Sequence, residues 1–208
     1  MINKLHLAMI ELYRGDAKRI QHFCKVHSYA KLIAETENVD KECLFIIEAA
    51  ALTHDIGIHS CEEKYGNCNG KLQEKEGPAI AEKMLKELGF EQDVSDRVQY
   101  LIAHHHTYNN IDEIDYQILV EADFLVNIME DGLSKEAALK AYESIFKTTC
   151  GKMICRELIK VFGGAVALED GDTVSAYEPT VEQKSELYVE EKRRIAQYAA
   201  GLIEDEDF

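Results

Sequence analysis

Apolar residues recur every three or four positions along most of the chain, a spacing that is typical of amphipathic α-helices. The first such stretch begins after Asp16, whose side chain can cap a helix. A second stretch begins at Asp40 and becomes apolar on nearly every side in its later half, as expected of a central buried helix. It ends in the adjacent pair His54-Asp55, after which Gly57 permits the backbone to change direction.

Residues 58–71 differ from this pattern, because glycines and asparagines stand among charged side chains and predict a loop. Helices are predicted again over 72–88, 93–103, 113–129, 134–148, 151–162 and 180–203. Gly77-Pro78 is expected to kink the first of these or to divide it. The fold class is therefore all-α, a bundle of about nine helices. Residues 1–162 are expected to form the domain, and residues 163–208 a loop and a C-terminal helix packed on it.

Composition supports this class and limits the partners. Apolar residues make up 46% of the chain, and there are only 2 prolines and no tryptophan, which favours helices over a turn-rich β-fold. The net charge of −16 disfavours binding to a nucleic-acid polymer, whereas a bound dication can still attract a small anionic substrate. The chain has no secretory signal or membrane-spanning stretch, so we expect a cytoplasmic protein with free thiols. Monomer and homodimer both remain open.

Several metal-binding residue types lie on apolar faces. His22 is in register with Val26 and Ile33, so its helix turns it toward the core. Asp123 lies between apolar positions of a later helix, and a buried carboxylate must be paired or bound to a metal. Taken alone, each is more often a core histidine or a helix-capping aspartate than a metal ligand.

The order of these residues, His then His-Asp then His then Asp on successive helices, resembles the HD superfamily of metal-dependent phosphohydrolases. The resemblance covers roughly residues 16–130. Its matching stretches are Arg19-Ile20-Gln21-His22, Ala50-Ala51-Leu52-Thr53-His54-Asp55-Ile56-Gly57, Ile102-Ala103-His104-His105-His106 and Glu121-Ala122-Asp123. The resemblance implies an HD-domain helical bundle in which His22, His54, Asp55 and Asp123 bind a divalent transition metal. Fe, Mn and Zn suit such ligands, with Mg or Ni as replacements in vitro.

A second metal depends on further ligands, for which the chain matches the superfamily pattern only in part. In two-metal members of the superfamily, further histidines come from a segment that falls here on His105 and His106. Those members often carry His-Pro between the two regions, where this chain has Gly77-Pro78 preceded by Glu76, a candidate substitute ligand.

A lysine that some members carry three residues after the HD aspartate is replaced here by Ile58. Lys64, Lys71 and Arg97 are therefore the candidates for holding a phosphate, although each is more often a solvated surface charge. Tyr108 and Asn109 follow the histidine run and are candidates to line the substrate pocket. The segment after that run lacks the HD-GYP signature, which disfavours a cyclic dinucleotide phosphodiesterase.

The resemblance implies metal-assisted hydrolysis of a small phosphate ester or anhydride, with nucleotides as favoured substrates. Asp55, or a nearby histidine or glutamate, is the candidate base, and one of His104 to His106, with His105 favoured, is the candidate acid. Two alternatives stay open: a di-iron oxygenase of the same fold, and a non-catalytic module that senses a nucleotide.

Overall fold

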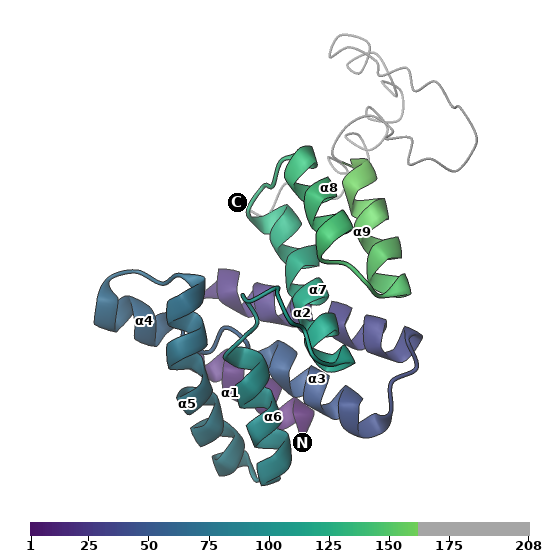
Figure 1. Ribbon diagram of the computed structural model, residues 1–208. Helices are drawn as coiled ribbons and strands as arrows, with labels where there is room; N and C mark the ends of the chain where they lie inside the picture. The colour runs from purple at the N-terminus through teal and green to yellow at the C-terminus, as the bar shows by residue number, and fades with distance from the viewer. Residues whose placement is uncertain (162–208) are drawn as a thin grey trace, which may run out of the picture. The chain divides into compact units, whose positions relative to one another are not determined.

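The computed structural model describes residues 1–161, which form helices α1 to α9 (Figure 1). Their bounds are α1 (Ile2–Leu12), α2 (Ala17–Thr36), α3 (Lys41–Thr53), α4 (Ile58–Tyr65), α5 (Gly70–Leu88), α6 (Gln92–Ile102), α7 (Ile114–Glu130), α8 (Lys135–Ser144) and α9 (Thr149–Val161). The described part of the chain contains no strand, so the all-α prediction is confirmed. The predicted helix over 180–203 and the segment before it lie outside the described residues.

Polar side chains define where several helices begin. The carboxylate of Asp16 accepts a hydrogen bond of 3.2 Å from the backbone N–H of Arg19, and Asp40 caps α3 in the same way at Cys43, at 2.8 Å. Such a side chain satisfies a backbone donor that the helix itself cannot pair. Both helices therefore start where the sequence predicts.

The centre of the bundle consists of α2, α3 and α7, each of which packs against the other two. The later half of α3 is completely buried from Ala49 to Leu52, and the small alanine side chains allow neighbouring helices to approach closely. Burying a leucine-sized side chain contributes about 1.5–3 kcal/mol, so this helix is a principal source of stability.

Helix α1 is absent from the sequence-based prediction. It packs on α3 and α5 through Leu5, Met9 and Tyr13, which are buried and spaced four residues apart. The Tyr13 hydroxyl donates a 2.7 Å hydrogen bond to the backbone carbonyl of Asp55. The N-terminal helix therefore supports the turn that carries the His-Asp pair.

The segment predicted as a loop over 58–71 is wrong in its first half, which is helix α4. Ile58 and Cys61 are buried one turn apart and hold this helix in place although most of its other residues are polar. Gly66 ends it with a φ of 71°, a left-handed conformation that glycine adopts without strain. The next helix, α5, is not divided, since it continues through Pro78.

The turn after α3 lies directly against α5 at Gly57 and Gly77. A Cβ atom on Gly57 would lie 2.9 Å from the backbone nitrogen of Gly77, and one on Gly77 would lie 2.7 Å from a side-chain carbon of Ile102. Gly57 has an ordinary helical φ of −78°. Its glycine is therefore required by this close approach and not, as the sequence suggested, by a change of backbone direction.

Glu121 joins α7 to the segment between α8 and α9. This buried carboxylate accepts hydrogen bonds of 2.5 and 2.9 Å from the backbone N–H groups of Lys147 and Thr148. These bonds satisfy donors just before α9, so the start of α9 is fixed to α7. Glu121 belongs to a stretch that resembles the HD superfamily, but its contacts are structural.

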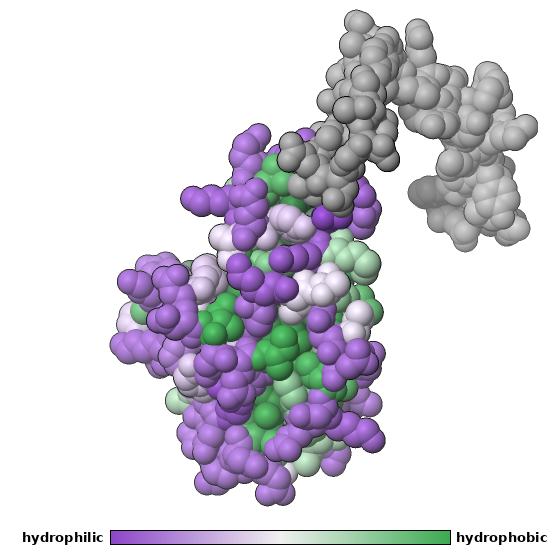
Figure 2. Space-filling view, turned by 45° about the vertical axis from the view of Figure 1, so that its right-hand side comes forward, coloured by the Kyte–Doolittle hydropathy of each residue, from purple (hydrophilic) through white to green (hydrophobic). Residues whose placement is uncertain are grey.

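The surface of the described residues is mostly polar. In Figure 2, hydrophilic residues cover most of the visible face, with apolar residues in separate groups between them. Among residues 1–161, no helix is long and apolar enough to cross a bilayer.

Candidate metal centre

Two helices and the turn that follows a third bring the predicted primary ligands to one point. His22 comes from α2, His54 and Asp55 from the turn that follows α3, and Asp123 from α7. His54 is fully buried, and His22 and Asp123 are also buried. Because these elements form the packed centre of the bundle, their side chains are held in place by the hydrophobic core.

The nitrogen and oxygen atoms of these residues converge. The Nε2 atom of His22 lies 3.2 Å from the Nε2 atom of His54 and 3.2 Å from Oδ1 of Asp123. The Oδ2 atom of Asp55 lies 3.5 Å from the Nε2 atoms of both histidines. Two imidazoles and two carboxylates around one centre form a donor set that suits Zn, Mn or Fe.

The opposite nitrogen of each imidazole has an outer partner. Nδ1 of His22 lies 2.9 Å from Oε2 of Glu130, and Nδ1 of His54 lies 2.9 Å from the backbone carbonyl of Ala51. A carbonyl can only accept, so Nδ1 of His54 carries the hydrogen and Nε2 faces the cluster. Such outer hydrogen bonds orient imidazoles for metal binding.

Electrostatics of the cluster also suit a cation. Burial lowers the pKa of His54, but Asp55 and Asp123 outweigh it and raise that pKa to about 9. Burial raises the pKa of Asp55, but His54 and His105 outweigh it and lower that pKa to about 2. Without a metal, protons on the histidines balance the carboxylates, and a bound cation would displace them.

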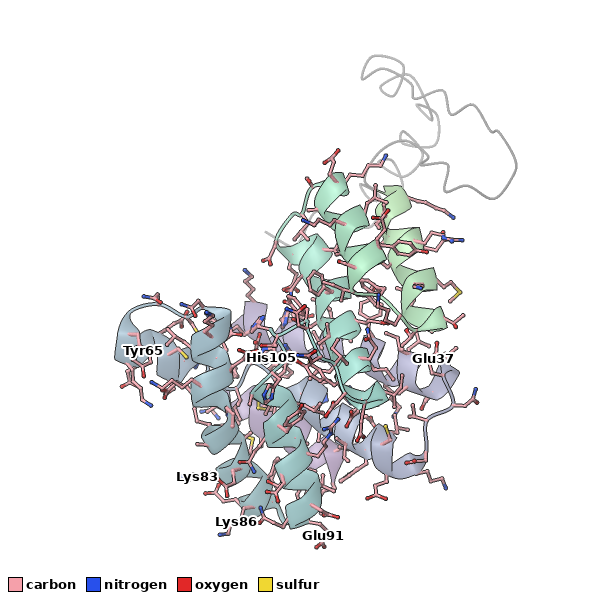
Figure 3. All side chains as sticks on the ribbon, viewed as in Figure 1. Glu37, Tyr65, Lys83, Lys86, Glu91 and His105 are labelled. Atoms are coloured by element: carbon pink, nitrogen blue, oxygen red, sulfur yellow. The ribbon has the colours of Figure 1, made fainter. Side chains whose placement is uncertain are left out.

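A second group of possible ligands adjoins the first and consists of Asp55, His105 and His106, whose donor atoms lie within 4.8 Å of one another. His105 lies in the middle of the helices (Figure 3), and its Nδ1 donates to the carbonyl of Ile102 at 2.7 Å. Its Nε2 atom is buried without a hydrogen-bond partner among the described residues and lies 3.6 Å from Oδ1 of Asp55. A buried nitrogen without a partner is costly, and a metal ion would satisfy it.

His106 is held differently from His105. Its Nε2 pairs with the side-chain oxygen of Gln73, and its backbone N–H donates to Glu74 at 3.0 Å. Burial and the neighbouring His105 lower the pKa of His106 to about 4, so its ring is neutral at pH 7. A neutral imidazole retains the lone pair that a metal requires.

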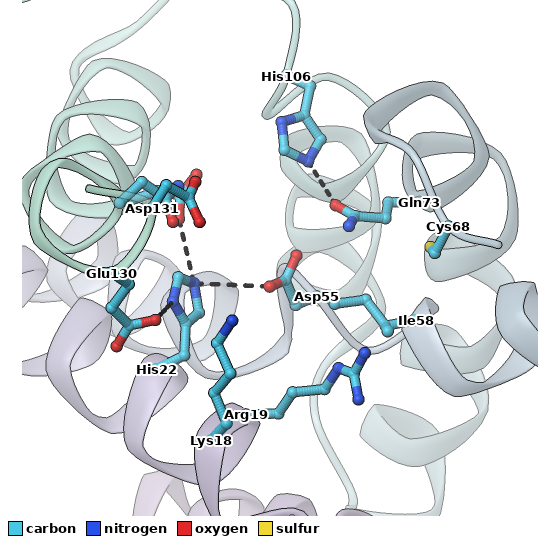
Figure 4. A pocket seen from close by; sticks show the side chains of 12 residues that line it. Lys18, Arg19, His22, Asp55, Ile58, Cys68, Gln73, His106, Glu130 and Asp131 are labelled. Atoms are coloured by element: carbon cyan, nitrogen blue, oxygen red, sulfur yellow. Dashed lines mark hydrogen bonds and ion pairs between the residues drawn. The ribbon is translucent and has the colours of Figure 1, made fainter. Parts of the chain in front are cut away.

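Members of both groups line one pocket of about 450 Å³ (Figure 4), whereas the fully buried His54 and His105 lie behind its wall. Its lining comprises Lys18, Arg19, His22, Asp55, Ile58, Cys68, Gln73, His106, Asp123, Asn127, Glu130 and Asp131. Two cations from the start of α2 and several polar groups from the end of α7 thus share the pocket with the metal-binding residues.

The model of the HD domain family matches residues 19–145. The chain belongs to this family. The HD domain implies divalent metal binding, and the family lies within a superfamily of metal-dependent hydrolases.

A solved structure shares the HD fold. The crystal structure of a predicted HD superfamily hydrolase from an uncultured Thermotogales bacterium aligns with a TM-score of 0.55 and 20% identity, over 94% of this chain and 92% of that chain. At this identity the likeness concerns the fold. A search of curated proteins finds no match.

Within this HD domain, several predicted site residues lie elsewhere. Arg97 binds Asp115 at 2.6 and 2.8 Å and Asp112 at 3.0 Å, so its charge is already paired and it does not line the pocket. Glu76 pairs with Lys64 and accepts a 2.9 Å hydrogen bond from Tyr65, which turns it toward α4 and away from the second group of ligands.

The remaining predicted substrate contacts are also absent from the pocket wall. Lys71 is exposed, and Tyr108 packs edge-on against Phe124 with ring centroids 5.2 Å apart. Neither residue lines the pocket, and neither does the exposed Asn109. His105, the predicted acid, is fully buried behind Asp55 and is likewise not part of the wall.

The sequence analysis missed the pocket cations Lys18 and Arg19 and the α7 residues around Asp131. One signal was available for Lys18, which precedes His22 by four residues and therefore lies on the same side of α2. Gln73 precedes the predicted Glu76 by three residues, and only the packing of α5 decides which of the two reaches the histidines.

Proposed function

We propose that this HD-domain protein is a metal-dependent phosphohydrolase that acts on a small phosphate ester or anhydride, with nucleotides among its candidate substrates. The observation that carries the proposal is the sharing of one pocket by the residues suited to a divalent cation and by two cationic side chains, Lys18 and Arg19. Cations beside such a centre suit an anionic substrate.

The metal ligands in this proposal are His22, His54, Asp55 and Asp123, with His105 and His106 as further ligands beside Asp55. When bound, a divalent cation lowers the pKa of water toward neutrality and stabilises negative charge on phosphoryl oxygens. The convergent donor atoms fit such an ion, and so does the Nε2 atom of His105, which has no hydrogen-bond partner among residues 1–161.

Asp55, Lys18 and Arg19 have separate roles in the proposed reaction. Asp55 lines the pocket and is ionised at neutral pH, so it is placed to accept a proton from an attacking water. Lys18 and Arg19 orient the anionic end of the substrate. His105 does not line the pocket, so we keep it as a further ligand beside Asp55 and do not assign it to protonating the leaving group.

The test is hydrolysis of a panel of phosphate esters and anhydrides by protein reconstituted separately with Mn, Zn and Fe. His54→Ala should lose both metal content and turnover, because it removes a buried ligand. Glu76→Ala is the matched control, since it removes a carboxylate from the neighbouring α5 outside the pocket. Full turnover in His54→Ala would refute the proposal.

A di-iron oxygenase is the second candidate, favoured by the group of Asp55, His105 and His106 beside the first centre. Anaerobic purification, iron analysis and oxygen-consumption measurements would separate the two functions. Hydrolysis with Mn or Zn and no oxygen uptake supports the phosphohydrolase.

A further inference from the structure

The mouth of the pocket has two chemically different sides. Lys18 and Arg19 lie on α2, whereas Glu130 and Asp131 lie at the end of α7 (Figure 4). Asn127, which also lines the pocket, lies one turn earlier on α7. One side is positively charged and the other is acidic. A substrate that enters the pocket therefore meets a positively charged side and an acidic side.

Two of these charges already have partners within the protein. Arg19 pairs with Asp16 and lies 2.6 Å from Glu62. Glu130 lies 2.9 Å from both His22 and Lys25. Neither side chain can turn fully to a ligand without giving up these contacts.

Lys18, Asn127 and Asp131 differ from their neighbours. Their side chains make no hydrogen bond or ion pair with any part of residues 1–161. Asn127 and Asp131 are four residues apart and so lie one above the other on α7. Among the described residues, the pocket wall thus offers one unpaired cation on α2, one unpaired amide on α7 and one unpaired carboxylate at the end of α7.

This arrangement distinguishes between phosphate compounds. A single phosphoryl group beside the metal-binding residues can be matched by Lys18, the one unpaired cation of the pocket wall within the described chain. Any further phosphates of a diphosphate or triphosphate that reach the α7 side would meet Asp131, whose carboxylate has no partner among residues 1–161, and like charges repel. A hydroxyl or amino group on the same side would instead donate hydrogen bonds to Asp131 and Asn127.

Resting on the phosphohydrolase function proposed above, we infer that the site selects phosphate monoesters of hydroxylated or amino-bearing alcohols over di- and triphosphates. Lys18 binds the phosphoryl oxygens, and Asn127 and Asp131 bind the leaving group. In the reaction the water oxygen bonds to phosphorus, the ester P–O bond breaks, and one water proton ends on the alcohol. The products are the alcohol and inorganic phosphate.

The experiment compares kcat/KM for AMP, ADP and ATP with the full-length, metal-loaded protein. We expect AMP to exceed ATP by about tenfold or more, the ratio that corresponds to about 1.4 kcal/mol. Asp131→Asn should raise kcat/KM for ATP several-fold. The metal content of this variant should equal that of the unmodified protein. Equal kcat/KM for AMP and ATP in the unmodified protein would overturn this inference and leave the phosphohydrolase function standing.

Lys18→Gln tests the other side of the mouth. It should raise KM for AMP by about tenfold and weaken binding of inorganic phosphate in calorimetry, without changing metal content. Lys86 is an exposed lysine in the last turn of α5, so Lys86→Gln is the matched control. It should change neither KM for AMP nor the binding of inorganic phosphate. Unaltered phosphate binding in Lys18→Gln would exclude its role. Absence of hydrolysis with every phosphate compound would refute the proposed function itself.

Discussion

The two groups of possible ligands differ in how the protein holds them. His22, His54 and Asp123 come from the mutually packed α2, α3 and α7 and are buried. His105 and His106 instead follow the end of α6, and His106 is fixed by polar contacts to α5. Hydrophobic packing thus defines the first group, whereas the second depends on a few hydrogen bonds. We expect the first to retain a metal more tightly.

Asp55 belongs to both groups, so its removal should have the largest effect. Its Oδ2 atom faces His22 and His54, and its Oδ1 atom faces His105. Asp55→Asn should lower kcat/KM by roughly 10³-fold, as expected when several kcal/mol of transition-state stabilisation are lost. Metal analysis should show loss from both groups. Retention of the full metal content would show that the two groups do not share this carboxylate.

His106→Gln tests the difference between the groups directly. It removes a ligand from the second group and leaves the atoms around His22 unchanged. We expect the protein to keep one tightly bound ion and to lose a weaker one, measured by metal titration. Loss of all metal would mean that the two groups bind ions as a single unit.

Tyr13→Phe tests the outer support of the shared carboxylate. It deletes the hydrogen bond to the backbone carbonyl of Asp55 and leaves the buried ring in place. The loss should be about 1 kcal/mol in the free energy of unfolding, measured by urea denaturation. A larger fall in metal affinity than in stability would show that α1 positions the site.

Asp16→Ala should have an effect of similar size that depends on pH and is confined to α2, which carries His22. Removing the cap should cost about 1 kcal/mol at pH 7. Burial raises the pKa of Asp16, but hydrogen bonds from Arg19 outweigh it and lower the pKa to about 2. The ionised group therefore stabilises the fold above its unfolded pKa of about 4, and this contribution disappears as the pH falls toward 2.

Asp16→Asn separates capping from charge, because asparagine is also a good cap. Its stability relative to the unmodified protein should improve as the pH falls from 4 to 2. A difference that stays constant over this range would contradict the charged role of Asp16.

Sequence patterns predicted the elements whose own residues determine them. The apolar run of α3, the caps of α2 and α3, and the fold family are all present in local sequence. The predicted ligands His22 and Asp123 meet because their helices pack on α3. Their role as ligands stays a prediction.

The missed features depend on contacts between distant segments. Helix α4 is polar apart from two buried anchors, so its local pattern resembles a loop. From the sequence, Arg97 is a candidate to bind phosphate. In the fold, its guanidinium group is paired with Asp115, which is 18 residues away in the chain. Ion pairs between distant residues determine which cationic side chains can still bind a ligand, and the local sequence does not show these pairs.

The close approach of Gly57 and Gly77 has a consequence for engineering this protein. Because a Cβ on Gly57 would meet the backbone of Gly77, and a Cβ on Gly77 would meet the side chain of Ile102, a combinatorial library randomised at both positions should return glycine almost exclusively. The substitutions tolerated around the pocket will lie instead at its mouth, on side chains such as Lys18 and Asp131. Altering the substrate range should therefore start from the mouth, with the paired glycines left fixed.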